Sequence, residues 1–393
     1  MKNNFFVFSL KKNLIPCIFY LFTICLVLFS NSNLIATKNG ITLWANSVLP
    51  ALLPFFIATE LLNYTNIISI LGKRLNKFMR PLFNVPGEGA YAFIMGIISG
   101  YPIGAKLVAK LKEDGICTLV ESERLLAFTN NSGPLFIIGT VGISLLGDTR
   151  TGLLLFFTHV LACLSVAFIF RFWKSNQTRC RSSLQFVGKS SLAIKKENVS
   201  FSNLGEVLSN SIINALNTII MIGGFVVLFS VITSILNQCH IISGISNLLY
   251  NLFSIPINFS NSIITGIVEL TNGLKSLCSI HSRNFSNIVV LCSFLLGFGG
   301  ISVMLQVISI TSKAEISIKP YFIGKCLQGI LAAFYTYLIL NTTKLFNLDL
   351  ASVSSSLSSP IIKFPINLNV IGWLVVFACI LIIFIKSLKK HFM

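Results

Sequence analysis

The sequence predicts an all-α, polytopic integral membrane protein with discontinuous or re-entrant helices. Three observations carry this prediction. Of the 393 residues, 54% are hydrophobic and only 11% are charged, a composition unlike that of soluble globular domains. The charges stand in short clusters between apolar runs that are long enough to cross a bilayer. Several of these runs are interrupted in their middle by glycine, proline and polar residues, so we expect roughly eight to ten spanning or re-entrant segments.

The net charge of +18 does not indicate a nucleic-acid-binding protein. The basic residues lie in loops between apolar runs, which is the distribution that the positive-inside rule describes. Both chain ends are basic, so both are expected in the cytoplasm, as in a multi-pass protein of the cell membrane. None of the ten cysteines falls in a metal-ligand spacing, and we expect neither a metal nor a cofactor.

Charge and hydropathy divide the chain into five parts. An N-terminal span (1–39) precedes a first membrane half (40–173), a cytoplasmic basic linker (174–203), a second membrane half (204–341), and a loop with a C-terminal span (342–393). The first apolar run is too long for a signal peptide, so it is expected to be retained. Prolines in 40–63 predict a bent span there.

Residues 66–83 predict a basic amphipathic helix at the membrane surface, because apolar residues recur at helical spacing and basic residues fill the other face. Glu60, near the end of the bent span, is expected to be an interfacial carboxylate. His159 lies inside the apolar run 151–170, where we expect a packed, hydrogen-bonded histidine rather than a ligand or a proton relay. The mixed charges between Lys110 and Arg124 are expected to reach water or an aqueous vestibule.

Two polar interruptions define the candidate site of the first half. They lie in 99–106 and 129–134, inside apolar runs. Non-helical backbone at membrane depth is tolerated only inside protein or beside water, so two such breaks predict a binding site for a small polar solute. The candidate residues are Ser99, Gly100, Tyr101, Pro102, Gly104, Lys106, Asn130, Asn131, Ser132, Gly133 and Pro134.

The second half carries a weaker version of this pattern. Its apolar run 262–280 is interrupted around 269–273, and the next run has glycines at 297–300. Gly96 and Gly133 correspond in order to Gly266 and Gly300, which predicts a two-fold internal repeat with the site between its halves. The candidate residues from this half are Glu269, Asn272, Gly273 and Lys275.

The residue types in these breaks suit a polar ligand. Unpaired backbone groups at helix ends offer partial charges, and Asn and Ser side chains offer donors and acceptors. Lys106 and Lys275 suit an anionic group, and Glu269 suits a proton or a cation. A packing role is the alternative: the spacing of Gly96, Gly100 and Gly104 also suits close helix contact, and Lys106 could snorkel to an interface.

The motifs GYPIGAK and FTNNSGPLFIIGTVG resemble the YlbJ family of sporulation integral membrane proteins, which carry a nucleoside-recognition or Gate domain. The resemblance extends from about Thr42 to the C-terminal span. It implies a role in endospore formation on the mother-cell side, in the outer forespore membrane, and in making the spore cortex. It also implies a nucleoside-like or cortex-related solute.

We therefore expect a transporter or gate for a small polar solute. The alternative is a non-transporting membrane scaffold of a sporulation assembly. No HExxH, GxSxG or Walker motif is present, so we expect no enzyme and no ATP-driven pump. The candidate partners are the lipid bilayer, the solute, further copies of the chain and other sporulation membrane proteins, but not nucleic acid.

Overall fold

The computed structural model describes residues 2–175, 203–280 and 285–345. All regular structure in these ranges is helical. Most of the expected basic linker and the expected C-terminal span lie outside the described residues.

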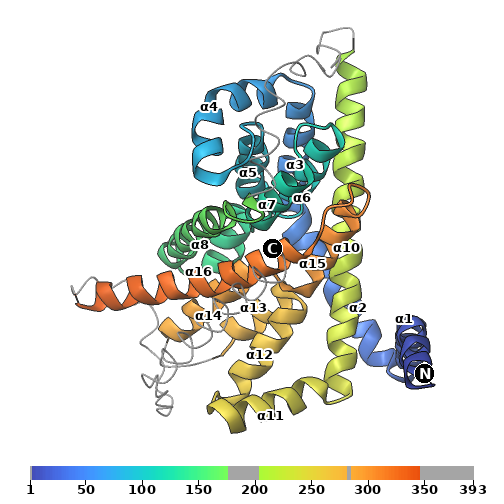
Figure 1. Cartoon of the computed structure of the whole chain (residues 1–393). Helices are drawn as coiled ribbons and strands as arrows, with labels where there is room; N and C mark the ends of the chain where they lie inside the picture. The colour runs from blue at the N-terminus through green and yellow to red at the C-terminus, as the bar shows by residue number, and fades with distance from the viewer. Residues whose placement is uncertain (1, 176–202, 281–284, 346–393) are drawn as a thin grey trace.

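The first part of the chain begins with long helices and continues with shorter ones (Figure 1). In chain order these are α1 (Lys2–Leu28), α2 (Ser30–Leu43), the π-helix η1 (Trp44–Val48), α3 (Leu49–Asn63), α4 (Ile67–Phe83), α5 (Gly89–Ile98), α6 (Ile103–Glu113), α7 (Leu119–Thr129), the π-helix η2 (Leu135–Leu145) and α8 (Thr149–Phe170).

The second part begins and ends with a long helix and has shorter helices between them. In chain order it contains α10 (Leu204–Gln238), α11 (Ile241–Phe253), α12 (Ile257–Val268), α13 (Leu270–Cys278), α14 (Phe285–Phe298), α15 (Gly300–Thr311) and α16 (Lys319–Leu345).

Five helical segments of the described residues are long and apolar enough to cross a membrane: Ser30–Asn63, Thr149–Phe170, Leu204–Gln238, Phe285–Thr311 and Lys319–Thr342. The prediction of an all-helical membrane protein is therefore confirmed for the described chain. The irregularity expected near Pro50 takes the form of η1, whose π-helical turn directly precedes α3.

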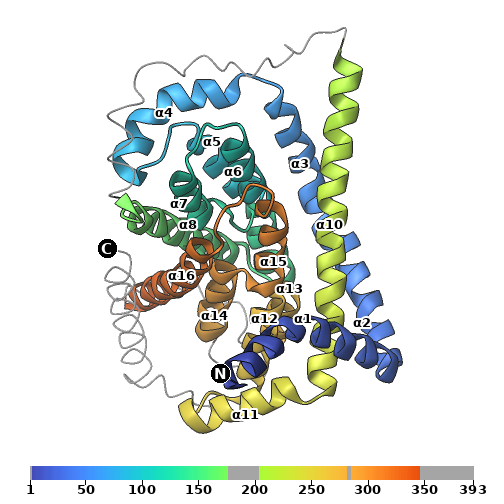
Figure 2. The ribbon, with the colours of Figure 1, turned by 45° about the vertical axis from the view of Figure 1, so that its right-hand side comes forward.

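The longest helix, α10, connects the two ends of the molecule. Its 35 residues extend about 52 Å at 1.5 Å per residue, more than the thickness of a hydrocarbon core. Figure 2 shows α4 at one end of α10 and α11 at the other. Asn203 and Cys239, which flank α10, therefore lie at opposite ends of the described protein.

Discontinuous helices are present in both halves, as predicted. Residues 99–102 separate α5 from α6, and 130–134 separate α7 from η2. Glu269 separates α12 from α13, and Gly299 separates α14 from α15. Gly299 and Gly300 have φ of 85° and 82°, a left-handed backbone conformation that glycine adopts without steric cost.

Glycines allow the helices that flank the breaks to approach one another. A Cβ atom on Gly96 or Gly104 would lie 1.9 or 2.1 Å from the Thr129 carbonyl oxygen, so only glycine fits at these two positions. In the second half, a Cβ atom on Gly273 would lie 2.0 Å from the Cα atom of Gly266. Gly96 and Gly104 therefore have the packing role that the sequence allowed as an alternative.

Apolar side chains of the described residues form two large cores and a small third cluster around Cys25, Val231 and Ile235. The first contains Phe56 and Leu125, and the second contains Ile137, Leu274 and Leu295. Because lipid is as apolar as these side chains, close packing rather than exclusion from water stabilises such cores within a bilayer.

The predicted amphipathic helix is α4, which lies at the edge of the molecule (Figure 1). Lys73, Arg74 and Lys77 are exposed, while Met79 is buried. The helix ends at Asn84, which adopts a left-handed conformation with φ of 56°.

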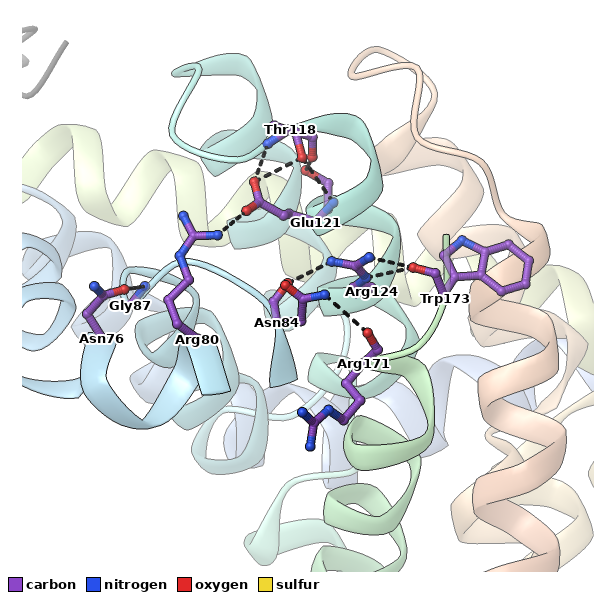
Figure 3. Close-up of polar contacts among 10 residues, drawn as sticks. Asn76, Arg80, Asn84, Gly87, Thr118, Glu121, Arg124, Arg171 and Trp173 are labelled. Atoms are coloured by element: carbon purple, nitrogen blue, oxygen red, sulfur yellow. Dashed lines mark hydrogen bonds and ion pairs between the residues drawn. The ribbon is translucent and has the colours of Figure 1, made fainter. Parts of the chain in front are cut away.

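Arg124 of α7 contacts the C-terminal ends of two helices and is fully buried. Its guanidinium donates to the carbonyl oxygen of Asn84 at 2.8 Å and, through Nε, to that of Trp173 at 2.8 Å (Figure 3). Carbonyl groups at helix C-termini carry partial negative charge, so one arginine on α7 holds the C-terminal ends of α4 and α8.

Two carboxylates of α7 are also buried and paired. Glu121 forms a capping box with Thr118 and an ion pair with Arg80 (Figure 3). Glu123 pairs with Lys174 at 2.9 Å. The expectation that the charges of this connector reach water is therefore wrong for Glu121, Glu123 and Arg124, because their partners come from helices distant in the sequence.

The orientation of α10 gives a first testable prediction. Single cysteines replacing Asn203 and His240 in a cysteine-free version of the chain should be labelled by an impermeant maleimide from opposite sides, Asn203 from the cytoplasm. The physical reason is that α10 is long and apolar enough to cross the bilayer between them. Labelling of both from one side would contradict a spanning α10, and reversed sides would contradict the charge-based orientation.

Candidate functional site

The first break is held against α3. Ser99, at the end of α5, is buried, and its hydroxyl lies 3.0 Å from the Thr59 hydroxyl. Gly100 follows with φ of 79°, and the Tyr101–Pro102 peptide bond is cis. The backbone therefore turns sharply here before α6 begins at Ile103.

The second break turns two asparagines in toward α16. Asn130, Asn131 and Ser132 are all buried. The Asn130 amide donates to the Tyr321 hydroxyl at 2.9 Å. The Asn131 amide donates to the Phe128 carbonyl at 2.7 Å, and its side-chain oxygen accepts from the Gln328 amide at 2.8 Å. These hydrogen bonds orient both asparagine side chains toward α16.

Three polar atoms of the second break have no hydrogen-bond partner among the described residues. They are the Thr129 hydroxyl, the side-chain oxygen of Asn130 and the Ser132 hydroxyl. A buried polar group without a partner costs about 1–3 kcal/mol, and each such group in a folded protein calls for an explanation. Three of them in four consecutive residues indicate a place where a polar ligand or water completes the structure.

The two breaks touch through their backbones. A Cβ atom on Gly100 would lie 2.9 Å from the backbone nitrogen of Gly133. Beside this contact is a cavity of about 20 Å³, lined by Gly100, Tyr101 and Gly133 together with apolar residues of η1, α3 and η2. This volume holds one water molecule. The first half is therefore closed at the point where its two breaks meet.

Lys106 is engaged in an ion pair. Its ammonium lies 2.7 Å from the Glu60 carboxylate and donates to the Thr218 hydroxyl at 3.1 Å. Glu60 is buried and paired within the protein, and its expected position at the membrane interface stays a prediction. The pair joins α3, α6 and α10, and contact between Lys106 and a solute stays a prediction.

The candidate residues of the second half have different surroundings. The Glu269 carboxylate accepts from the backbone N–H groups of Thr271 at 3.0 Å and Asn272 at 2.7 Å, and so caps α13. The Asn272 amide donates to the Ser230 hydroxyl of α10 at 3.1 Å. Lys275 is exposed, and a site shared between the two halves stays a prediction.

The second half contains a glycine contact of the same kind as the first half. A Cβ atom on Gly300 would lie 3.2 Å from the Gly266 carbonyl oxygen and 3.3 Å from the Leu270 nitrogen. Gly300 thus lies on the α12–α13 break, as Gly133 lies on the α5–α6 break.

A buried polar cluster on α8 and α16 was not predicted from the sequence. The Lys325 ammonium nitrogen donates to the Gln328 side-chain oxygen at 2.7 Å, and the Gln328 amide also lies 3.3 Å from Nε2 of His159. His159 is buried, which confirms a packed histidine. The sequence signal that could have indicated this cluster is the lysine inside the apolar run of α16. Ionisable residues within membrane spans are costly to bury and commonly functional.

The Lys106–Glu60 pair gives the next prediction. Lys106→Met should lower the unfolding temperature of the detergent-solubilised protein, because it leaves the Glu60 carboxylate buried without its cation. Breaking a fully buried pair costs about 3–5 kcal/mol, and the 33% exposure of the Lys106 side chain reduces this cost. The double variant with Lys106→Met and Glu60→Gln should regain most of the unfolding temperature that Lys106→Met alone loses.

The matched control is Lys77→Met, which removes an exposed lysine of α4 and should be neutral. If Lys106→Met were equally neutral, the lysine would snorkel and the pair would carry no stability. A double variant less stable than Lys106→Met alone would also contradict the pairing.

Comparison with known proteins identifies the family of the chain. A family model described as "Gate: Nucleoside recognition" matches residues 45–172, which contain both breaks of the first half. The sporulation integral membrane protein YlbJ of Bacillus subtilis (strain 168) is 34% identical to the chain over 341 residues, or 83% of this chain and 82% of that protein. No solved structure matches the chain. With this identity over most of both sequences, the chain belongs to the YlbJ family of sporulation integral membrane proteins.

Proposed function

We propose that the protein moves a small polar solute of the nucleoside class across the membrane through the breaks of its discontinuous helices. One observation carries this proposal. The Thr129 hydroxyl, the Asn130 oxygen and the Ser132 hydroxyl are buried without partners, and they lie within the segment matched by the nucleoside-recognition model. A recognition segment with unpaired polar atoms at its break is what a binding site requires.

The chemistry of these atoms suits a nucleoside. The Asn130 side-chain oxygen accepts hydrogen bonds, while the hydroxyls of Thr129 and Ser132 both donate and accept. A nucleoside offers ribose hydroxyls and base edges with both kinds of group. The C-terminal carbonyls of α7 and the N-terminal amides of η2 face the same break and add partial charges of both signs.

Transport requires the breaks to separate, because the cavity beside them has room for one water only. The contact between Gly100 and Gly133 involves backbone atoms only, and beside it the Tyr101 ring packs edge-on against Phe136 of η2, so opening has to separate one aromatic pair as well. We infer a cycle of alternating access in which this contact opens to admit the solute.

We further infer that residues 40–173 and 204–341 are two structural repeats. Each half contains an amphipathic helix (α4 or α11), two broken helices and a long closing helix (α8 or α16). The correspondence of Gly133 and Gly300, each against the preceding break, supports this inference. Because α4 and α11 lie at opposite ends of the molecule (Figure 2), the repeats would have opposite orientations in the membrane, an arrangement known among transporters.

The biological setting follows from the family. The relative is named a sporulation integral membrane protein, and we propose that this chain also acts in endospore formation. The proposed place is the mother-cell side, in the outer forespore membrane, with both termini cytoplasmic. The proposed consequence is a solute supply needed to form the spore cortex.

Solute binding should depend on Ser132. Ser132→Ala should leave the stability of the empty protein unchanged or higher, since the hydroxyl has no partner to lose. It should weaken stabilisation by uridine or adenosine, because one net hydrogen bond is worth about 0.5–1.5 kcal/mol, or about two- to tenfold in affinity. The measurement is the unfolding temperature against nucleoside concentration.

The control for this experiment is Ser211→Ala on α10, which removes another buried hydroxyl without a described partner. It should keep the full nucleoside response. If no nucleoside or related polar solute stabilises the unmodified protein, the scaffold alternative is favoured instead.

The cellular role can be tested by deleting the gene in its host. Vegetative growth should remain normal, while the spores should be heat-sensitive with a defective cortex, because the proposed solute is needed only in spore formation. Expression of the unmodified chain should restore heat resistance. Impaired growth with normal spores would instead indicate a general transporter.

A further inference from the structure

Lys325 lies in a membrane-spanning helix and is almost completely buried. It is 2% exposed, on a segment of α16 that is long and apolar enough to cross the membrane. Its nitrogen has one described hydrogen bond, to the Gln328 side-chain oxygen at 2.7 Å. An amide oxygen carries only a partial charge, so this bond does not neutralise an ammonium group.

The buried carboxylates of the described residues all have other partners. Glu60 pairs with Lys106, Glu121 with Arg80, and Glu123 with Lys174. Glu269 caps the N-terminus of α13. Among the described residues, an ammonium at Lys325 would therefore lack a counter-charge, at a cost of several kcal/mol for a buried unpaired ion.

The groups that face Lys325 do not supply a negative charge either. From α8 come His159 and the Cys163 thiol, and α14 has no charged residue along its length. The acidic residues of α7, which also packs against α16, are Glu121 and Glu123, and these pair with Arg80 and Lys174. Tyr321, one turn earlier on α16, donates no charge and accepts a hydrogen bond from Asn130. In the closed protein this environment accommodates a neutral amine better than an ammonium.

The amine is connected to the second break by hydrogen bonds. Lys325 donates to the Gln328 oxygen, and the Gln328 amide donates to the Asn131 oxygen at 2.8 Å. Asn131 stands between Asn130 and Ser132, which carry unpaired polar atoms. Opening of the break would therefore alter this network and admit water to it.

We propose that Lys325 is the coupling-proton site of transport. This inference rests on the proposed function and names its coupling ion. When the break is open and hydrated, the lone pair of the Lys325 amine takes a proton from water and becomes an ammonium. The solute-loaded protein carries this proton across, releases it with the solute to the water on the other side, and returns empty and closed with a neutral amine. Each passage of the solute is thereby linked to the binding and release of one proton.

The test uses the full chain in proteoliposomes with uridine as the probe. Two quantities are measured: exchange of labelled uridine at equal pH on both sides, and accumulation of uridine driven by a pH gradient, with a pH-sensitive dye inside the vesicles. The unmodified chain should show both, and uridine entry should change the internal pH. Lys325→Met should keep exchange and lose both the accumulation and the pH change.

Two further variants keep the test decisive. Lys319→Met removes an exposed lysine at the start of the same helix and should behave as the unmodified chain. Lys325→Arg should also lose gradient-driven accumulation, because a guanidinium does not release its proton. If Lys325→Met does not reach the membrane, Lys325→Gln replaces it in the same measurements.

The outcomes separate the two proposals. Exchange without any proton movement in the unmodified chain would overturn the proton site while keeping nucleoside transport. Proton-coupled accumulation that persists in Lys325→Met would overturn it as well. If the variant loses only the uptake of uridine monophosphate, Lys325 is a counter-charge for anionic solutes and not a proton site. Absence of uridine exchange in the unmodified chain would reject the proposed function and this inference with it.

Discussion

The structure depends on the requirement that backbone N–H and C=O groups be satisfied where no water is available. Continuous helices meet this requirement by themselves, but the interruptions at 99–102, 130–134, 269 and 299 do not. The protein places these breaks against one another and against side chains of neighbouring helices. Backbone that would be costly in lipid is thereby enclosed in protein, and its polar groups become available for function.

Close approach of glycines makes this enclosure possible. Gly96 and Gly104 receive the end of α7, and Gly100 meets Gly133. Ion pairs and caps hold the surrounding helices: Arg124 binds the ends of α4 and α8. The result is a closely packed set of helices around a few polar atoms without described partners, which suits the solute site proposed above.

The positions of the breaks could be predicted from the sequence, because glycine, proline and asparagine act on the local backbone. The partners of the charged residues could not. Lys106 binds Glu60 and Thr218, which are 46 and 112 residues away, and Gln328 binds Asn131 across 197 residues. Such contacts depend on the packing of whole helices. Lys325 carried a local signal, a lysine in an apolar run, but its connection to the second break became visible only in three dimensions.

We propose above all that a nucleoside enters between the two breaks of the first half and supplies hydrogen-bond partners for their polar atoms. The most direct measurement is an experimental structure of the protein determined with saturating nucleoside. We expect the nucleoside to lie within hydrogen-bond distance of Asn130 and Ser132. We also expect Gly100 and Gly133 to be farther apart than in the closed protein. A nucleoside bound elsewhere while Gly100 and Gly133 remain in contact would contradict it.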